Sequence, residues 1–127
     1  MLQCVRPDTL GVDPYLSRTI TQRLMDRGAN VLEIPQTIKE LSPAMKELER
    51  SLRTHELLHE HNTAARWCFG NVRCYVDGNE NLKPMKNRSI GRIDMTVAWI
   101  IAMATAMVRQ AARPDLAQAL ESPDFTL

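Results

Sequence analysis

The sequence predicts an α/β fold made of a parallel βαβ unit, a β-hairpin and a long C-terminal helix. Two strand-like segments near the N-terminus flank a stretch with helical spacing of apolar residues, which is typical of parallel strands joined by a helix. In the middle of the chain, an alternating segment leads into an Asp-Gly turn. The last part carries an apolar stripe at helical spacing, which indicates a buried helix.

Size and charge limit what the chain can be. Its 127 residues, 44% of them hydrophobic, suffice for one compact domain with a core. We assign residues 1–113 to that domain and residues 114–127 to a loosely held tail. Sixteen Lys and Arg against fifteen Asp and Glu leave a net charge of +1, so no global field favours nucleic acid or membrane. Three cysteines without C-x-x-C spacing favour a reducing cytosol, and the N-terminus has no apolar signal-peptide region.

The βαβ unit is expected near the N-terminus. Thr9–Val12 is its first strand and runs into Asp13-Pro14, where Asp suits an N-cap and Pro the first helical position. A helix is therefore expected to start there and to end at Gly28. Asn30–Ile34 is the second strand. The apolar positions of the helix are Leu16, Ile20 and Leu24.

Two shorter helices and a hairpin are expected next. Ser42-Pro43 repeats the cap-and-proline signal and opens one helix, and Asn62 caps another. Residues 72–76 alternate between apolar and polar side chains and lead into the turn Asp77-Gly78. Pro84 interrupts the returning strand, which favours an edge position for it.

The last helix is expected to start with Ser89 as its N-cap. Its longest apolar run, Val97–Val108, is about a dozen residues, short of the roughly 20 that span a bilayer. We therefore interpret it as a core helix. The buried stripe consists of Ile93, Val97, Ile100, Ala104 and Met107.

A local pattern suggests a zinc peptidase. His55, Glu56 and His59 form a literal H-E-x-x-H, which on a helix places two imidazoles on one face and a glutamate as general base. A third ligand is required, and His61 is only two positions beyond His59, so it would point to another face. The pattern also begins where the preceding helix should end. We therefore favour coincidence over a zinc site.

Two aspartates are candidates for chemistry. Asp13 is sufficiently explained as an N-cap, yet it also lies at the carboxyl end of a predicted parallel strand, where open α/β sheets place their ligands. Asp94 suits the early part of the last helix, where a negative charge interacts favourably with the helix dipole. Its neighbours Ile93, Met95 and Val97 are apolar, and a carboxylate held close to a core needs a partner, such as a metal ion.

Positive charge concentrates between the hairpin and the last helix. A strip of basic residues can hold phosphates, although a solvated loop is the simpler interpretation. The chain contains no Gly-x-x-x-x-Gly-Lys-Ser/Thr element, so the sequence gives no sign of a P-loop nucleotide site. The basic strip consists of Lys83, Lys86, Arg88 and Arg92.

Nine short stretches, taken in order, carry a resemblance to one family. They are Gly11–Tyr15, Val31–Gln36, Leu41–Pro43 with Lys46–Glu49, Leu58-His59 with Asn62, Arg66-Trp67, Asn71-Val72, Asp77–Asn79, Lys83-Pro84 with Lys86, and Arg92–Asp94 with Val97-Ala98. No single stretch is specific, but the collinear set, spanning about residues 11–109, resembles the end of the large terminase subunits of tailed bacteriophages.

Large terminases join an N-terminal ATPase, which drives DNA into a procapsid, to a C-terminal nuclease with a ribonuclease-H-like fold. That nuclease cuts concatemeric DNA with two divalent metals held by acidic residues. The resemblance implies a partial ribonuclease-H-like fold here, with Mg²⁺ or Mn²⁺ as the metal. Asp94 would be the carboxylate on the last helix, and Asp13 the one that ends the fourth strand of the sheet. It places His59 in a connecting segment common in the family.

The resemblance also implies partners and a location. The substrate would be double-stranded DNA, the partners of the full protein the terminase small subunit and the procapsid portal, and the location the bacterial host cytoplasm. The family's first metal-binding Asp, on the first strand of its sheet, and the ATPase both lie upstream of anything matched here. Met95 and Thr63 stand where members often have Gly and Pro.

We therefore expect part of a terminase nuclease that does not cleave DNA by itself. The strand at residues 9–12 is expected to expose an unpaired edge that recruits a second copy into a homodimer or higher oligomer. One alternative is a small non-catalytic DNA-binding or assembly module that uses the basic strip. The other, with the weakest support, is a zinc metallopeptidase based on residues 55–59.

Overall fold

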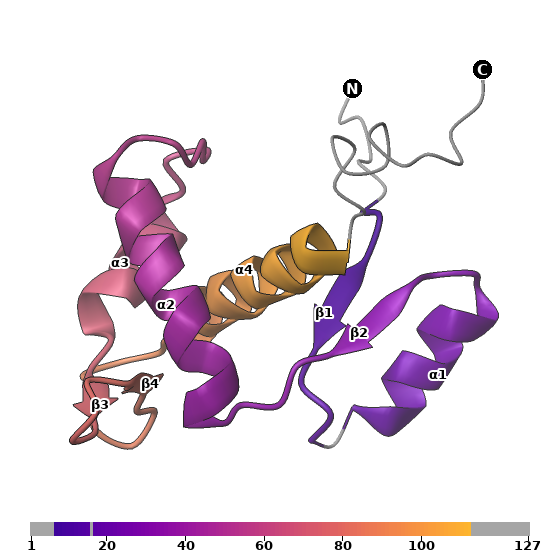
Figure 1. Cartoon of the computed structure of the whole chain (residues 1–127), viewed down its shortest axis with the longest axis horizontal. Helices are drawn as coiled ribbons and strands as arrows, with labels where there is room; N and C mark the ends of the chain where they lie inside the picture. The colour runs from indigo at the N-terminus through magenta and orange to yellow at the C-terminus, as the bar shows by residue number, and fades with distance from the viewer. Residues whose placement is uncertain (1–6, 16, 113–127) are drawn as a thin grey trace, which may run out of the picture.

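The computed structural model describes residues 7–15 and 17–112. Its elements are β1 (Leu10–Val12), α1 (Arg18–Asp26), β2 (Val31–Glu33), α2 (Ile38–Arg53), α3 (Thr63–Asn71), β3 (Cys74–Val76), β4 (Leu82–Pro84) and α4 (Asp94–Ala112). In Figure 1, α2, α3 and the β3–β4 hairpin gather around one end of α4, while β1, β2 and α1 lie toward its other end. The predicted tail, residues 114–127, and Cys4 lie outside the described residues.

The predicted βαβ unit is confirmed. β1 and β2 pair in parallel with α1 between them, and Gly11 stands opposite Leu32 in the register. The Leu10 N–H donates to the Asn30 carbonyl oxygen, and the Ile34 N–H donates to the Val12 carbonyl oxygen, each at 2.8 Å. Because backbone groups alternate in direction along a parallel strand, those of Gly11 point to the other edge of β1.

The predicted start of the first helix at Asp13-Pro14 is wrong, since α1 begins at Arg18 with Ser17 at the N-cap position. The Asp13 carboxylate instead accepts the Tyr15 N–H at 3.1 Å. A side chain that closes such a turn two residues onward holds the backbone outside the helix. Gly28, in contrast, ends the helical segment as expected, with a φ of 78°. Leu16 is not among the described residues.

The second helix also begins earlier than predicted, at Ile38 rather than at Ser42-Pro43. Thr37 is the N-cap and accepts the Glu40 N–H at 3.3 Å, so the Thr-x-x-Glu pattern was the true start signal. Pro43 lies inside α2. The buried Ser42 hydroxyl is used elsewhere: it accepts the Leu82 N–H at 2.9 Å and ties α2 to the hairpin.

The short third helix and the hairpin follow the prediction. Asn62 caps α3 by accepting the N–H groups of Ala64 and Ala65. β3 and β4 pair antiparallel, and β4 ends at Pro84. The connection is longer than an Asp-Gly turn, because the Asp77 carboxylate accepts the N–H groups of residues 79 and 81 and closes a loop around itself.

The last helix begins at Asp94, not after Ser89. The Ser89 hydroxyl donates to the Met85 carbonyl oxygen at 2.6 Å and accepts the Arg73 N–H, so it shapes the loop before α4. α4 has 19 residues, and by length and composition alone it could cross a membrane. Core helices of soluble proteins share these features, and its buried stripe accounts for them.

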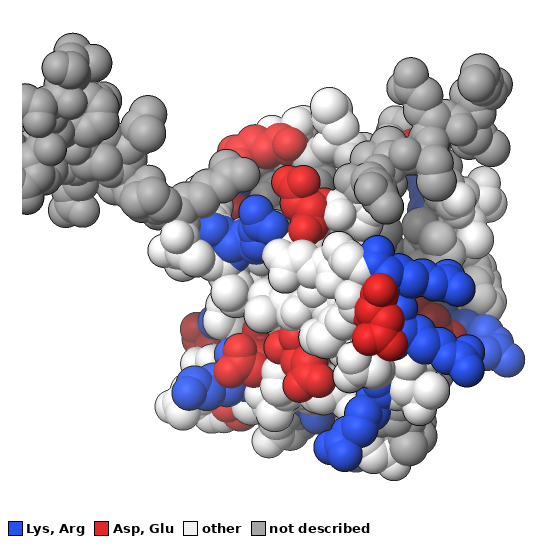
Figure 2. All heavy atoms as spheres, turned by 90° about the vertical axis from the view of Figure 1, so that its right-hand side faces the viewer, with Lys and Arg blue, Asp and Glu red and all other residues white. Residues whose placement is uncertain are grey.

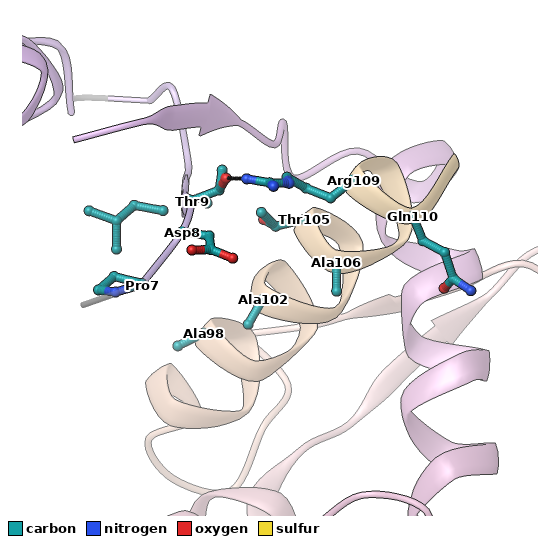
Figure 3. A pocket seen from close by; sticks show the side chains of 11 residues that line it. Pro7, Asp8, Thr9, Ala98, Ala102, Thr105, Ala106, Arg109 and Gln110 are labelled. Atoms are coloured by element: carbon teal, nitrogen blue, oxygen red, sulfur yellow. Dashed lines mark hydrogen bonds between the residues drawn. The ribbon is translucent and has the colours of Figure 1, made fainter. Parts of the chain in front are cut away.

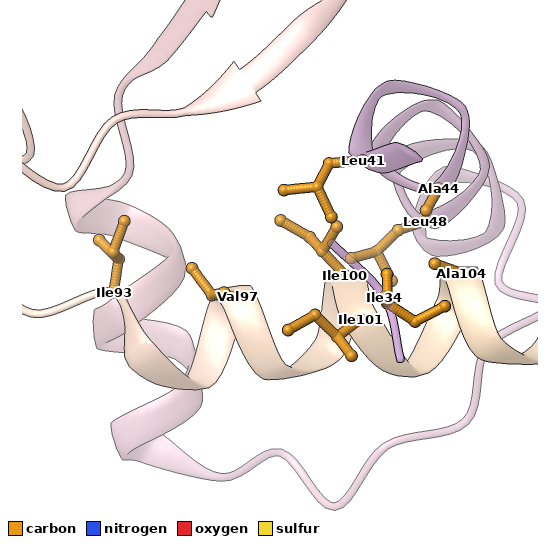
Figure 4. Packing of buried hydrophobic residues seen from close by; sticks show 9 residues of the cluster. All are labelled: Ile34, Leu41, Ala44, Leu48, Ile93, Val97, Ile100, Ile101 and Ala104. Carbon is orange, nitrogen blue, oxygen red and sulfur yellow. The ribbon is translucent and has the colours of Figure 1, made fainter. Parts of the chain in front are cut away.

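The core lies where α4 crosses α2 (Figure 4). Leu41 and Ile100 have exposed fractions of 0% and 2%, and Ile34, just after β2, reaches the same cluster. Four of the five predicted stripe residues are buried, and Met107 packs against the cluster from its margin. The cluster consists of Ile34, Leu41, Ala44, Leu48, Ile93, Val97, Ile100, Ile101 and Ala104.

β1 lies directly on α4 at Gly11. A Cβ atom there would stand 2.0 Å from the Thr105 Oγ1 atom and 2.9 Å from the Ile101 Cγ2 atom, so only glycine permits this approach. Two residues earlier, the Thr9 hydroxyl accepts a hydrogen bond from the Arg109 guanidinium. β1 is therefore anchored to the C-terminal half of α4.

Candidate functional site

Asp13 lies one residue beyond the carboxyl end of β1 and is partly buried. One carboxylate oxygen accepts the Tyr15 N–H at 3.1 Å, and the other accepts the Gln36 Nε2 at 2.6 Å. Gln36 follows β2, so the ends of both parallel strands position this carboxylate. Sequence reasoning gave Gln36 no role, because a contact over 23 residues leaves no local pattern.

Asp94 is the first residue of α4, and its surroundings differ from those expected. Its side chain is 65% exposed and lies 3.6 Å from the Lys86 Nζ atom and 4.0 Å from an Arg92 guanidinium nitrogen. The expectation of an apolar environment is wrong because Ile93 and Val97 turn into the core while Asp94 turns away from it. The partners of Asp94 are thus two cations of the basic strip.

The direction of β1 relates the two aspartates. Along β1, contacts with α4 pass from Arg109 at Thr9 to Thr105 and Ile101 at Gly11. The strand therefore runs antiparallel to the helix, so the carboxyl end of β1, which precedes Asp13, points toward the end of α4 that begins with Asp94. Across residues 7–15 and 17–112, no three His, Cys, Asp or Glu side chains gather into a metal site. The arrangement offers two carboxylates from different elements, short of a full cage.

The four residues of the basic strip lie between β4 and the start of α4. Lys86, Arg88 and Arg92 are exposed and Lys83 is half-buried. Two of the four are near Asp94, so this carboxylate offsets part of their charge. Figure 2, which shows the opposite side of the molecule around α1, has basic and acidic side chains interspersed. The strip is a local feature of a molecule with almost no net charge.

The H-E-x-x-H segment does not have the geometry that a zinc helix requires. α2 ends at Arg53, and His55 has a φ of 57°, so the two imidazoles are not separated by one helical turn. Arg50 binds the Glu56 carboxylate through two hydrogen bonds of 2.8 and 2.7 Å, which lower the pKa of Glu56 below its usual value. A glutamate held in this way is a poor general base.

A groove of about 650 Å³ runs between one side of α4 and the edge of β1 that pairs with no other described strand. Figure 3 shows three alanines in a row along α4, with Asp8 and Thr9 of the chain before β1 across from them. These alanines are exposed although α4 is apolar on all sides. A helix of that composition is normally covered on all sides. The three are Ala98, Ala102 and Ala106.

The family is decided by comparison with known proteins. The family model described as "Terminase large subunit, endonuclease domain" matches residues 5–110, which is most of the chain. The chain belongs to this family. Protein YmfN of Escherichia coli strain K12 is 33% identical over 99 residues, which are 76% of this chain and 22% of YmfN.

A solved structure gives the same result for the fold. The HK97 bacteriophage large terminase matches with a TM-score of 0.68 and 22% identity, over 76% of this chain and 21% of that one. The ribonuclease-H-like, α/β fold class implied by the resemblance is thereby confirmed. The chain spans about a fifth of the length of each of these two relatives.

Terminase nucleases generally use divalent metals, and the chemistry of the two aspartates fits such ions. Carboxylate oxygens are the ligands that Mg²⁺ and Mn²⁺ prefer. Asp13 is held by hydrogen bonds, and Asp94 is accessible at its helix end. Two carboxylates alone bind Mg²⁺ weakly, since so few protein oxygens replace its water shell.

Proposed function

We propose that this chain is part of a phage large terminase nuclease that cuts concatemeric DNA during genome packaging, and that these 127 residues do not cleave DNA by themselves. The observation that supports this most is that Asp13 directly follows β1 and Asp94 begins α4, while β1 runs along α4 toward the end that Asp94 begins. Their number, two, falls short of what a two-metal site requires.

In the complete nuclease, divalent ions would activate water and stabilise the leaving oxygen of the phosphodiester. Asp13 and Asp94 would supply part of the oxygen ligands that hold them. Gln36 fixes the direction of the Asp13 carboxylate through its 2.6 Å hydrogen bond. Lys86 and Arg92 lie 3.6 and 4.0 Å from Asp94, and a cation bound at Asp94 would leave both side chains, with the rest of the strip, available to the DNA phosphates.

Partners follow from the family. We propose double-stranded DNA as the substrate, and the terminase small subunit and the procapsid portal as partners of the whole terminase. Packaging takes place in the bacterial host cytoplasm, where we place the protein. Free thiols suit that compartment, since the described cysteines, Cys68 and Cys74, form no disulfide.

We further propose that the free edge of β1 pairs with a second copy of the chain. Within the described residues β1 pairs only with β2, and the backbone groups of Gly11 point outward beside the β1–α4 groove. Such edges recruit strands. Light scattering is expected to show a dimer whose fraction rises with concentration, and a monomer at all concentrations would contradict this pairing.

A second candidate, a non-catalytic DNA-binding module, is favoured by the exposed basic strip. Both candidates predict salt-dependent binding to duplex DNA that weakens in a Lys83→Glu/Arg88→Glu variant, whereas Arg23→Glu/Arg27→Glu on α1 serves as the matched control. The two candidates differ in whether the chain cleaves DNA once the first strand of the nuclease sheet has been added to it. Fusing the upstream strand and its Asp from a full-length family member should restore Mn²⁺-dependent cleavage that Asp94→Asn abolishes.

The outcomes separate the candidates. Cleavage restored by the upstream strand and lost in Asp94→Asn supports the nuclease. Duplex binding that stays without cleavage after the fusion supports the binding module. Duplex affinity that is the same in the strip variant and in the α1 control would remove the DNA role of the strip in both candidates.

A further inference from the structure

A second cleft lies away from the aspartates and the basic strip, among the end of α2, the loop before α3, α3 itself and α4. We call it the His59–Trp99 cleft. It has a volume of about 410 Å³, within the range of small-ligand sites. Neither the metal site nor the pairing edge of β1 uses its residues.

The floor of the cleft is aromatic. The rings of Phe69 and Trp99 meet edge to face, with centroids 5.2 Å apart and an interplanar angle of 73°. His59 makes a second such contact with Trp99, at 5.7 Å and 60°. These contacts fix the Trp99 ring from two sides while it stays only partly buried. A floor of this kind suits a flat, apolar, aromatic ligand group.

The rim of the cleft donates hydrogen bonds. The Nδ1 atom of His59 accepts the His61 N–H at 3.2 Å, so the proton of the neutral ring resides on Nε2, and that nitrogen is a donor. Arg66 is exposed and forms no ion pair with any described carboxylate. No Asp or Glu is among the residues that line the cleft. The rim is therefore suited to an anion with several acceptor oxygens, such as a phosphate.

An aromatic floor beside a phosphate-binding rim matches a nucleotide. Duplex DNA keeps its bases stacked inside the helix, so only an unpaired nucleotide can present base and phosphate together. Resting on the proposed role in DNA processing, we propose that the His59–Trp99 cleft binds an unpaired nucleotide of single-stranded DNA. Its base lies against Trp99 and Phe69, and its phosphate lies at His59, His61 and Arg66.

The chain allows a direct readout of this binding. It has two tryptophans, and Trp67 is 56% exposed, so Trp67→Phe leaves Trp99 as the only indole without disturbing the core. A short oligothymidylate should quench Trp99 fluorescence in a saturable way, whereas a blunt duplex of the same length should not. Fluorescence anisotropy of a labelled oligothymidylate, measured with the parent protein, should give the same affinity as the quenching of Trp67→Phe.

Rim variants test the assignment of the phosphate. Arg66→Ala and His59→Ala change exposed side chains and should each weaken single-strand binding about tenfold, the order expected for the loss of a hydrogen bond to a charged group. His55→Ala is the matched control, because this exposed histidine in the same loop does not line the cleft. Its affinity should equal that of the parent protein, and circular dichroism should show equal helix content in all variants.

Several results would overturn the proposal. They are no saturable quenching, equal quenching by the duplex, equal affinities for Arg66→Ala and His55→Ala, and a higher affinity for an acidic aromatic peptide than for the oligonucleotide. The Lys83→Glu/Arg88→Glu variant separates this proposal from the nuclease assignment. It should lose duplex binding and keep Trp99 quenching, so one idea can fail while the other stands.

Discussion

The two halves of the molecule differ in how well they are packed. The half built from α2, α3, the hairpin and most of α4 contains nearly all of the buried core, including Leu41 at 0% exposure. In the β1–α1–β2 half, no strand residue is fully buried, and Ile20 and Met25 of α1 are 64% and 44% exposed. A two-stranded sheet is marginal by itself in water. The proposed metal ligands come one from each half, so the site depends on the weaker half.

The difference between the halves is consistent with our proposal that the chain folds but does not cleave DNA by itself. The stronger half contains most of the buried apolar side chains, and the weaker half, which carries Asp13, contacts α4 through Gly11 and Thr9. An added strand in the β1–α4 groove would bury the alanines of α4 and extend the sheet, and would thereby fix Asp13.

The largest expected effect comes from the stronger half. Leu41→Ala should lower the free energy of unfolding by about 2–5 kcal/mol, because it leaves a cavity at a fully buried position. Leu24→Ala on α1, which is only half-buried, should cost less than half as much. Urea unfolding followed by circular dichroism measures both. Equal losses would mean that the halves are equally packed.

Substituting the glycine between the halves should have the next largest effect. Gly11→Ala places a Cβ atom 2.0 Å from the Thr105 Oγ1 atom, and that hydroxyl is held by the Ile101 carbonyl oxygen at 2.8 Å. The forced shift should cost about 1–3 kcal/mol. Gly70→Ala in α3, where a Cβ would meet no atom within 4 Å, should instead stabilise by about 0.5–1 kcal/mol. The same sign for both variants would rule out a tight β1–α4 contact.

A smaller effect is expected at the start of α3. Asn62→Ala removes the acceptor of the Ala64 and Ala65 N–H groups and should cost about 1 kcal/mol. Asn79→Ala in the hairpin loop removes no described side-chain hydrogen bond and is the control. Thermal unfolding should separate the two variants. A loss in Asn79→Ala as large as in Asn62→Ala would show that the cap contributes nothing specific.

The smallest expected effect depends on pH. Hydrogen bonds from Arg50 lower the pKa of Glu47 and of Glu56. The stability that these two pairs add to the fold is therefore complete at pH values above the unfolded pKa of about 4.3. It is lost as the pH falls through the lowered folded values. The melting temperature of Arg50→Gln should therefore be below that of the parent protein near pH 7 and approach it near pH 3. A difference that does not change with pH would contradict the pairing.

The sequence predicted which elements exist better than where they begin. Apolar periodicity is a local property, so the parallel pair, the hairpin and the stripe of α4 were confirmed. The capping signals at Asn62 and Gly28 held, but those at Asp13 and Ser42 misled, and both of these side chains have distant partners. Asp13 binds Gln36, and Ser42 binds the Leu82 N–H, 40 residues away. No local pattern reveals such contacts.

The candidate site shows the same limit. The resemblance identified Asp13 and Asp94, but residue type alone could not distinguish an exposed Asp94 from one facing the core. The side chain of Asp94 points away from the buried Ile93 and Val97, and this direction depends on where α4 begins. The sequence likewise gave no sign of the His59–Trp99 cleft, whose residues come from segments far apart in the chain.

Paramagnetic broadening by Mn²⁺ tests most directly whether Asp13 and Asp94 form one site. With millimolar Mn²⁺ and an isotope-labelled protein, the amide signals of Asp13, Tyr15 and residues 93–95 should broaden together, because both carboxylates would face the same ion. Asp94→Asn should remove the broadening at both segments, whereas Asp26→Asn, a carboxylate on α1, should leave it unchanged. Broadening confined to one segment, or equal in the two variants, would contradict a shared metal site.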